Sequence, residues 1–201
     1  MASRENGWHG DIDGAVPVVD DERPLVRLVR SYLERERFRV IEAFDGRHAL
    51  DAARAAQPLA QRRGVRLHGD VTGRPAAVLA DVDRIGEALH NLLDNAIRHT
   101  APGGDVTVTT KVDGGWVELV VADDGEGIDA ADLPHVFERF YRADASRGHH
   151  DAGSGIGLTI VDAIVRAHGG DVHADSRGRG TGARFTIRLP SARAARGLIG
   201  S

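Results

Sequence analysis

The chain has 201 residues, which is enough for one domain with a sizeable core and a further segment. Its hydrophobic content of 41% and charged content of 28% are ordinary for a globular protein, and its net charge of −4 argues against a nucleic-acid-binding role. The absence of cysteine excludes disulfides and thiolate metal sites, and no apolar run reaches the roughly 18 residues of a membrane span, so we predict a cytoplasmic protein without membrane contact.

The first 57 residues predict a leader followed by alternating strands and helices. Residues 1–14 are polar and are expected to form a flexible leader. The elements expected after it are a strand at residues 16–19, a helix at 25–36 that opens at Pro24, a strand at 38–43, a turn at Asp45-Gly46 and a helix at 47–56. This β-α-β-α order implies parallel strands with helical crossovers.

The acidic run Asp20-Asp21-Glu22 and the later Phe44-Asp45-Gly46 resemble the opening of a bacterial response-regulator receiver domain. In that family the acidic pair helps to hold Mg²⁺ beside a phospho-accepting Asp at the end of the third strand. Asp70 is the residue that would take this role, but no apolar third strand ending in Asp follows the helix, and no later strand ends in Lys-Pro. We therefore favour a partial receiver-like segment at residues 15–57 without phosphate chemistry.

From about Pro58 the composition changes, and a second set of elements is expected. They are strands at residues 65–68 and 76–80, a long helix capped by Asp81 or Asp83, strands at 105–112 and 116–122 joined by Asp113-Gly114-Gly115, a short helical piece at 133–141, a helix at 156–167, and strands at 171–174 and 184–189. Residues 191–201 are expected to be a frayed tail.

The expected long helix carries two asparagines beside its apolar face. Apolar residues recur at three- and four-residue steps over residues 89–97, the pattern of a helix with one face in a core. Asn91, Asn95 and Arg98 lie on another stripe, and His99 follows four residues after Asn95. Asparagine is a poor helix former, so these residues are either solvated polar groups on an exposed face or oxygen ligands for a hard cation and its phosphate cargo.

The strand at residues 116–122 runs into Asp123-Asp124-Gly125-Glu126-Gly127. An ionised aspartate only accepts hydrogen bonds, so it suits an exocyclic amine such as that of adenine, and glycines let a flat ring lie against bare backbone. A structural turn is the alternative interpretation of this motif.

The run Gly153-Ser154-Gly155-Ile156-Gly157-Leu158 stands just before the last expected helix. A helix N-terminus offers free N–H groups and a partial positive charge to a phosphate. A Rossmann site is disfavoured because a polar connection, not a strand, precedes these glycines, and a P-loop is disfavoured because no Gly-Lys-Ser/Thr follows.

Aromatic residues interrupt the polar connection at Phe137-Glu138-Arg139-Phe140-Tyr141-Arg142. Either they form a small cluster under the loop, or they belong to a hinged lid over a ligand. As part of a lid, Arg142 would supply a cation to a terminal phosphate.

The motifs occur in a defined order: the Asn91 and Asn95 helix, Asp123-x-Gly125-x-Gly127, the aromatic run, Gly153-x-Gly155-x-Gly157 and Gly180-x-Gly182. Each is weak alone, but the ordered set resembles the catalytic and ATP-binding domain of sensor histidine kinases, with its N, G1, F, G2 and G3 boxes, within the gyrase–Hsp90–histidine kinase–MutL group. The resemblance covers residues 58–190. It implies an α/β fold, a two-layer α/β sandwich of the Bergerat type, with ATP between the helices and a mobile lid.

Carried over residue by residue, the resemblance implies that Asn95 ligates Mg²⁺ and that Asn91 supports this site. It also implies that Arg98 and His99 reach the phosphates and that Asp123 receives the adenine amine. Mg²⁺ bound by one or two protein oxygens plus phosphates is what the tight hydration shell of this ion favours. The rest of the implied ATP pocket consists of Gly125, Gly127, Ile128, Phe140, Gly153, Gly155, Ile156, Gly157, Leu158 and Gly182.

The candidate catalytic residues are Asn91, Arg98 and Arg142. ATP-hydrolysing relatives such as gyrase and Hsp90 carry a Glu four residues before the Mg²⁺ asparagine, where it activates water. This chain has the neutral amide of Asn91 there, which is a poor base. The difference favours a kinase that keeps its γ-phosphate for an acceptor, because phosphoryl transfer depends mainly on positioning and charge neutralisation.

None of the ten histidines lies in a Ser/Thr-His-Glu-Leu-Arg-like run, where the family's dimerisation domain carries its phosphoacceptor. The predicted partners are therefore ATP, a separate dimerisation domain that receives the phosphate in trans, and a response regulator. Residues 49–63 fit the tail of the second dimerisation helix, and the run at residues 53–58 fits either that helix or the second helix of a receiver. We hypothesise that a receiver opening joins an ATP-binding domain at this stretch. Two alternatives remain open: a nucleotide-binding interaction module without turnover, and a serine kinase of the anti-sigma type.

Overall fold

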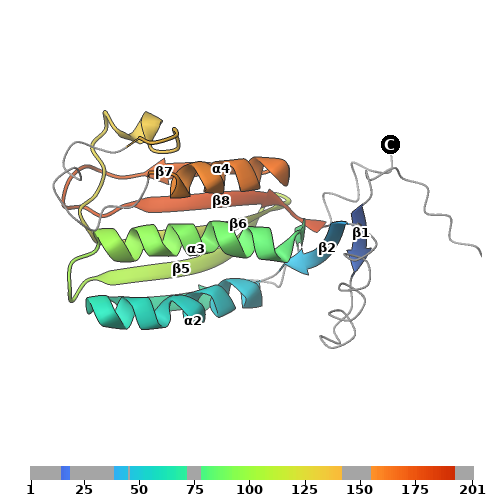
Figure 1. Ribbon diagram of the computed structural model, residues 1–201, viewed down its shortest axis with the longest axis horizontal. Helices are drawn as coiled ribbons and strands as arrows, with labels where there is room; N and C mark the ends of the chain where they lie inside the picture. The colour runs from blue at the N-terminus through green and yellow to red at the C-terminus, as the bar shows by residue number, and fades with distance from the viewer. Residues whose placement is uncertain (1–14, 19–38, 45, 72–77, 142–154, 193–201) are drawn as a thin grey trace, which may run out of the picture.

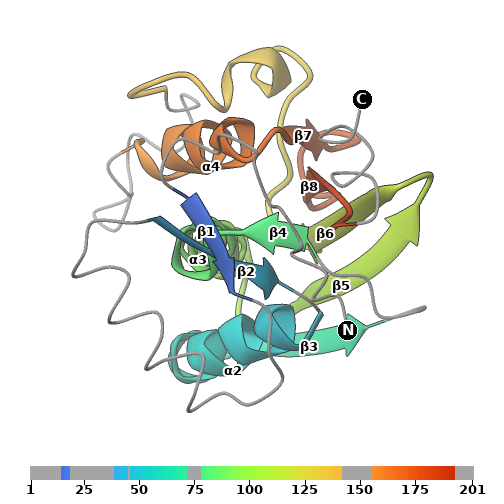
Figure 2. The ribbon, with the colours of Figure 1, turned by 90° about the vertical axis from the view of Figure 1, so that its right-hand side faces the viewer.

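The computed structural model describes residues 15–18, 39–44, 46–71, 78–141 and 155–192. Over these residues, five strands form one sheet in the order β3-β5-β6-β8-β7, and α2, α3 and α4 lie side by side across one face of it (Figures 1 and 2). The elements are β1 (Ala15–Val18), β2 (Arg39–Phe44), α2 (Gly46–Arg63), β3 (Arg66–Val71), β4 (Val78–Ala80), α3 (Val82–His99), β5 (Asp105–Asp113), β6 (Trp116–Asp123), the 3₁₀ turn η1 (Leu133–His135), α4 (Gly157–Ala167), β7 (Asp171–Asp175) and β8 (Arg184–Pro190). The mixed α/β fold expected from the sequence is confirmed.

The five-stranded sheet is mixed in direction. β3 runs parallel to β5, and the other neighbouring strands are antiparallel. β5 and β6 form the predicted hairpin, in which Asp113 pairs with Trp116 across Gly114 and Gly115. Both glycines have positive φ angles, 53° and 89°, which a tight two-residue hairpin turn requires and side chains disfavour.

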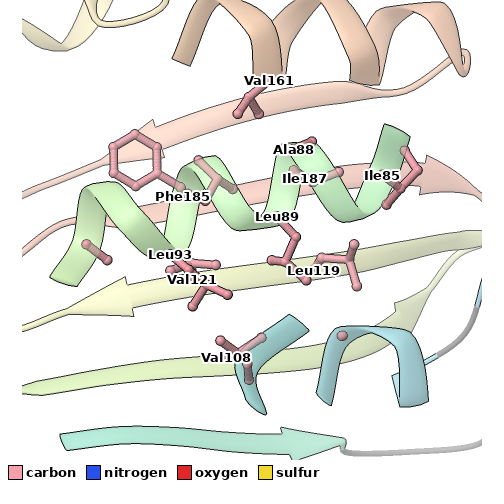
Figure 3. Packing of buried hydrophobic residues seen from close by; sticks show 14 of the residues in the cluster. Ile85, Ala88, Leu89, Leu93, Val108, Leu119, Val121, Val161, Phe185 and Ile187 are labelled. Atoms are coloured by element: carbon pink, nitrogen blue, oxygen red, sulfur yellow. The ribbon is translucent and has the colours of Figure 1, made fainter. Parts of the chain in front are cut away.

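The core lies between the helices and the sheet (Figure 3). Every second residue of β8 is buried, as expected for a strand with one covered face. Leu89 and Leu93 of α3 lie over Leu119 and Val121 of β6, and all four are fully buried. Burying a leucine side chain contributes about 1.5–3 kcal/mol to folding, so this interface holds α3 in one rotation about its axis. The stripe that carries Asn95 is thereby kept out of the core.

The long helix α3 begins at an aspartate cap. The Asp81 carboxylate accepts hydrogen bonds from the backbone N–H groups of Asp83 and Arg84, both at 3.1 Å. Asp81, and not Asp83, is therefore the N-cap, and it satisfies two donors that the first helical turn leaves without partners.

Helix α2 is longer than the sequence pattern predicts. The expected helix ends at Ala56, but α2 continues through Pro58 to Arg63. Its buried residues form a stripe of small side chains that belongs to the main core, namely Ala49, Ala53, Ala56 and Ala60. Packing of this stripe outweighs the loss of one backbone hydrogen bond at the proline. The domain boundary expected between residues 57 and 58 thus falls inside a helix whose two halves share one core.

The N-terminal strands belong to a separate small sheet in the order β1-β2-β4. β1 and β2 are parallel, as the β-α-β-α pattern predicts, whereas β4 pairs with β2 in the antiparallel direction. Because its third strand is antiparallel, this sheet does not establish the receiver-like segment that the sequence suggests. The acidic run Asp20-Asp21-Glu22 lies outside the described residues.

Two further expectations concern the tail and the membrane. At the start of the expected tail, Ser191 is buried and its N–H donates a hydrogen bond to the Gly115 carbonyl at 2.8 Å, and residues 193–201 lie outside the described part of the chain. Among the helices in the described part of the chain, none has both the length and the apolar character needed to cross a membrane.

Candidate functional site

The asparagine stripe of α3 meets the first turn of α4. The side-chain N–H of Asn91 donates to the Glu87 carbonyl at 3.0 Å, which fixes the orientation of the amide. Its oxygen Oδ1 then faces Gly157, where an added Cβ would stand only 3.2 Å away. Asn91 and Gly157, which are far apart in the sequence, are therefore in contact, as the predicted site requires.

The same stripe meets the loop after β6 at its other end. We call residues 123–128 the G1 loop. The His99 carbonyl accepts a hydrogen bond from the Glu126 N–H at 3.0 Å, and the His99 ring nitrogen Nδ1 lies 3.1 Å from a carboxylate oxygen of Glu126. Asn95 stands midway between Asn91 and His99, about 6 Å along the helix axis from each. The half-buried Asn95 side chain makes no hydrogen bond to another described residue, so its amide is available between the two contacts.

The two basic residues at the end of α3 are paired with carboxylates. Arg98 donates through Nε to Asp94 at 2.7 Å, and His99 faces Glu126. Partly exposed pairs of this kind contribute about 0–1 kcal/mol, so exchange of either carboxylate for a phosphate is not costly. In the structure, both side chains are thus directed at carboxylates.

Asp123 is positioned by backbone groups at the end of β6. Its oxygen Oδ1 accepts hydrogen bonds from the N–H groups of Gly125 at 2.9 Å and Ala183 at 3.2 Å. No hydrogen bond among the described residues uses the second oxygen, Oδ2. Burial raises the pKa of the Asp123 carboxyl above its ordinary value, and the two backbone hydrogen bonds oppose this rise. The carboxyl thus has one anchored oxygen and one that can accept a further donor.

Three predicted glycines are needed because other backbone segments touch them. A Cβ would lie 2.1 Å from the His99 carbonyl oxygen at Gly125, and 2.1 Å from the Gly178 carbonyl oxygen at Gly127. At Gly182, where φ is 73°, it would lie 1.9 Å from the carbonyl oxygen of Asp123. The sequence predicts that Gly125 and Gly127 let a ligand ring lie against bare backbone, and the resemblance places Gly182 in the ATP pocket. In the structure, the direction that a side chain would take at each of these glycines faces protein backbone, and their contact with a ligand stays a prediction.

The aromatic run divides into a packed part and an exposed part. The Phe137 ring meets Phe185 of the core edge-to-face at 6.3 Å, and Thr159 donates to the Phe137 carbonyl at 3.0 Å. Phe140 is 71% exposed, has a positive φ of 62°, and donates its N–H to the Gly155 carbonyl at 3.1 Å. Phe137 therefore matches the cluster interpretation, and Phe140 stays available to a lid.

Several other predicted site residues have simple positions. Ile156 is the N-cap of α4 and is 37% exposed, whereas Leu158 and Ile128 are partly buried and pack against the core. Arg142 and Gly153 lie outside the described residues.

The residues that hold the G1 loop from the opposite side were not predicted from the sequence. Ser176 accepts a hydrogen bond from the Ile128 N–H at 3.0 Å and donates to the Gly182 carbonyl at 2.7 Å. Arg179 donates to the Asp129 carboxylate at 2.6 Å. The only signal available for them was their place beside the Gly180-x-Gly182 motif, since serine and arginine are common in any turn.

A cavity of about 530 Å³ lies beside Phe137. It is lined by Glu118, Leu133, Phe137, Val172, His173, Ala174, Asp175, Thr186 and Arg188. None of the residues predicted to bind a nucleotide lines it, so it is not part of the candidate site.

The predicted site residues meet in a layered α/β fold, where they come from α3, the G1 loop, the turn before β8 and the start of α4. This arrangement defines an ATP-binding domain. Residues 80–193 match the family model described as "Histidine kinase-, DNA gyrase B-, and HSP90-like ATPase", and the chain belongs to this family.

Two similar proteins are named as sensor proteins of bacteria. Sensor histidine kinase CusS of Escherichia coli O157:H7 is 43% identical over 134 residues, which are 67% of this chain and 27% of CusS. Sensor protein SrrB of Staphylococcus aureus strain NCTC 8325 is 40% identical over 110 residues, which are 55% of this chain and 19% of SrrB. The chain therefore spans about a quarter or less of the length of these relatives.

Solved structures extend the likeness to three dimensions. The mycobacterial sensor histidine kinase MprB is 35% identical with a TM-score of 0.65, over 75% of this chain and 98% of that one. Full-length ShkA in complex with AMPPNP is 29% identical with a TM-score of 0.67, over 84% of this chain and 36% of that one. The chain thus carries the ATP-binding catalytic domain of a sensor histidine kinase.

Proposed function

We propose that this chain binds ATP with Mg²⁺ between α3, the G1 loop and the start of α4, and transfers the γ-phosphate to a histidine of a separate phosphoacceptor domain. One observation carries the proposal. Asn91 contacts Gly157, His99 contacts Glu126, and Asn95 lies between them on the same stripe of α3. A triphosphate placed along this stripe would have the G1 loop at one end and the start of α4 at the other.

The adenine end of the site centres on Asp123. Two backbone donors hold Oδ1, and Oδ2 is the oxygen that would accept the exocyclic amine. Because a buried polar group that loses its partner is costly, such a hydrogen bond discriminates strongly against a base that lacks the amine. Gly125 and Gly127 shape this end indirectly, by letting the loop pass close to α3 and to the turn before β8.

The metal position that fits the donor chemistry is Asn95. The described residues contain no group of three or more His, Asp or Glu that could hold a cation by themselves, so the site would depend on a neutral amide oxygen together with phosphate oxygens. That donor set suits Mg²⁺, which keeps most of its water and takes few protein ligands. When bound, the ion would neutralise charge on the phosphates. Asn91, oriented by Glu87, supports this end through its contact with Gly157.

Phosphate contacts require a change of partner in α3. Arg98 and His99 would leave Asp94 and Glu126 and turn towards the phosphate oxygens. Both residues lie in the last turn of the helix, and their present carboxylate pairs are weak. Arg142 is proposed as the lid cation on the motif alone.

The transfer step needs little acid–base chemistry from this chain. A nitrogen of the acceptor histidine attacks the γ-phosphorus, the bond from that phosphorus to the bridging oxygen of ADP breaks, and ADP leaves with the electron pair. The enzyme contributes alignment and charge neutralisation. Asn91 cannot act as the water-activating base that its position holds in ATP-hydrolysing relatives, so transfer to a partner is favoured over hydrolysis. The phosphate would then pass from the histidine to a response regulator.

We also propose that the ATP-binding unit includes α2. The alanine stripe of α2 lies in the same core as α3 and β5, so the unit extends N-terminal to residue 58. The segment before α2 remains a receiver-like candidate without an assigned function.

The proposal is tested by incubating the full chain with Mg²⁺ and γ-labelled ATP, alone and with an isolated histidine phosphoacceptor domain. Label on the histidine of the acceptor domain supports the kinase. Label on a serine of a supplied anti-sigma antagonist protein would instead support a serine kinase. Nucleotide binding without transfer to any acceptor would identify an interaction module. Failure of the folded chain to bind ATP would overturn all three.

A further inference from the structure

The G1 loop is held in place by a second turn that is distant in sequence. We call residues 176–182 the serine turn. Backbone hydrogen bonds run from Gly180 N–H to the Glu126 carbonyl at 2.6 Å and from Gly182 N–H to the Gly125 carbonyl at 3.1 Å. The two loops also touch where Gly127 meets the carbonyl of Gly178. The path of the G1 loop is thus determined by the serine turn as well as by α3.

One hydroxyl group stands at the centre of this contact. Ser176 Oγ donates to the Gly182 carbonyl at 2.7 Å and accepts from the N–H groups of Ile128 at 3.0 Å and Gly178 at 3.3 Å. A hydroxyl has one donor and two acceptor sites, so its capacity is fully used. The hydroxyl links the end of the G1 loop to both sides of the serine turn.

The link leads on to the adenine-binding carboxylate. Gly182, which accepts the Ser176 hydrogen bond, also presses against the Asp123 carbonyl, where a side chain would find no space. The next residue, Ala183, donates its N–H to Asp123 Oδ1. Ser176 therefore contacts the loop that follows Asp123 at Ile128, and it contacts Gly182, the neighbour of the residue that anchors the carboxylate.

We propose that Ser176 is a positioning residue for nucleobase recognition, which it governs without touching the nucleotide. This inference rests on the proposed ATP site. Every partner of the hydroxyl lies in the G1 loop or the serine turn, whereas the proposed metal ligand Asn95 is held by α3. Loss of the hydroxyl loosens the Asp123 carboxylate and leaves the metal position at Asn95 unchanged.

The test measures binding of ATP, ADP and GTP to the full chain by titration calorimetry, with and without Mg²⁺. Ser176→Ala is expected to weaken ATP and ADP binding by the same factor, about tenfold, which corresponds to one buried hydrogen bond. It is also expected to narrow the preference for ATP over GTP. The gain in ATP affinity on adding Mg²⁺ should stay as in the native chain, because the hydroxyl does not reach Asn95.

Thr181→Ala is the matched control. It also removes a hydroxyl from the serine turn, but that hydroxyl donates only to the Gly178 carbonyl at 2.7 Å and does not touch the G1 loop. This variant is expected to have the ATP affinity of the native chain and the same preference for ATP over GTP. If Ser176→Ala does not fold, Ser176→Cys takes its place, since a thiol has similar shape and is a weak hydrogen-bonding group.

Three outcomes would overturn the inference. They are an unchanged ATP affinity in the serine variants, an equal loss of ATP affinity in the serine and threonine variants, and a weakened ATP affinity with an unaltered ratio of ATP affinity to GTP affinity. Each of these requires that the native chain binds ATP. A native chain that fails to bind ATP would instead overturn the proposed function, so the two failures are distinguishable.

Discussion

The side-chain oxygen of Asn91 lies so close to Gly157 that a Cβ at that glycine would stand 3.2 Å from it. This contact joins α3 to the first turn of α4 and defines the phosphate end of the proposed site. Because the Asn91 amide also donates to the Glu87 carbonyl at 3.0 Å, a shift of the amide away from that Cβ would distort this hydrogen bond.

Gly157→Ala is therefore expected to weaken ATP binding about tenfold, the cost of displacing one hydrogen-bonded amide. Gly86→Ala is the control, since an added Cβ at this position in α3 meets nothing within 4 Å. It should raise the free energy of unfolding by about 1 kcal/mol through helix propensity and leave ATP affinity unchanged. Calorimetric titration and urea unfolding measure both effects. Equal ATP affinity in the two variants would show that the Asn91 contact has no part in binding.

Asn95→Ala is expected to remove the part of the ATP affinity that depends on Mg²⁺, because the amide oxygen of Asn95 is the proposed protein ligand of the ion. Nucleotide affinity in a chelator should change little. His90→Ala, an exposed position on the same helix, serves as the control. Titrations with and without Mg²⁺ give the measurement. A variant that retains the full Mg²⁺ effect would place the metal ligand elsewhere.

The protonation of Asp123 makes the stability of the fold depend on pH. Burial raises the pKa of its carboxyl in the folded state, so the protonated form is favoured by folding. Its stabilising contribution is present below the unfolded pKa of about 3.9 and is lost as the pH rises through the folded pKa; above that, the ionised carboxylate costs stability.

Asp123→Asn is thus expected to keep or raise thermal stability at neutral pH, since an amide oxygen can still accept from Gly125 and Ala183. ATP affinity should fall about tenfold to a hundredfold, because the amide presents N–H groups where the amine needs an acceptor. Thermal unfolding at pH 7 and pH 4, together with titrations at pH 7, measures the two effects. A large loss of stability at neutral pH with intact ATP affinity would contradict this role.

Helix α2 supplies a test of the domain limits. Ala60 is fully buried in the shared core, so Ala60→Asp places an unpaired charge there and is expected to cost about 3–5 kcal/mol of unfolding free energy. Gln61→Asp, at the exposed neighbouring position, should change stability by less than about 0.5 kcal/mol. Denaturant unfolding of the full chain, followed by circular dichroism, measures both. An unaffected Ala60 variant would mean that α2 is not part of the ATP-binding unit.

The two phenylalanines of the aromatic run are expected to differ in role. Phe137→Ala removes a ring that packs on Phe185 and should lower the free energy of unfolding by about 2 kcal/mol. Phe140→Ala should change it by less than about 0.5 kcal/mol, because this ring is 71% exposed. Urea unfolding separates the two. Similar losses in both variants would show that Phe140 also belongs to a packed cluster.

Local patterns in the sequence determined much of this protein. Apolar residues spaced three and four apart determined which face of α3 is buried. That choice also determined that Asn91 and Asn95 lie on a different stripe of the helix. The paired glycines predicted the β5–β6 hairpin, and an aspartate predicted the start of α3. These features depend on periodicity, capping and turn geometry, which involve residues close together in the chain.

Only the tertiary structure decided the features that depend on distant partners. A proline such as Pro58 predicts the end of a helix, yet α2 continues through it because its buried alanines pack in the main core. The sequence does not show that backbone carbonyls occupy the directions that side chains would take at Gly125 and Gly182. From the sequence, Ser176 is an ordinary turn residue, and only the folded structure shows that its hydroxyl bonds to Ile128 and Gly182. The physical reason is the same in each case: the deciding contact is made by residues far away in sequence, and its energy appears only once the layers have packed.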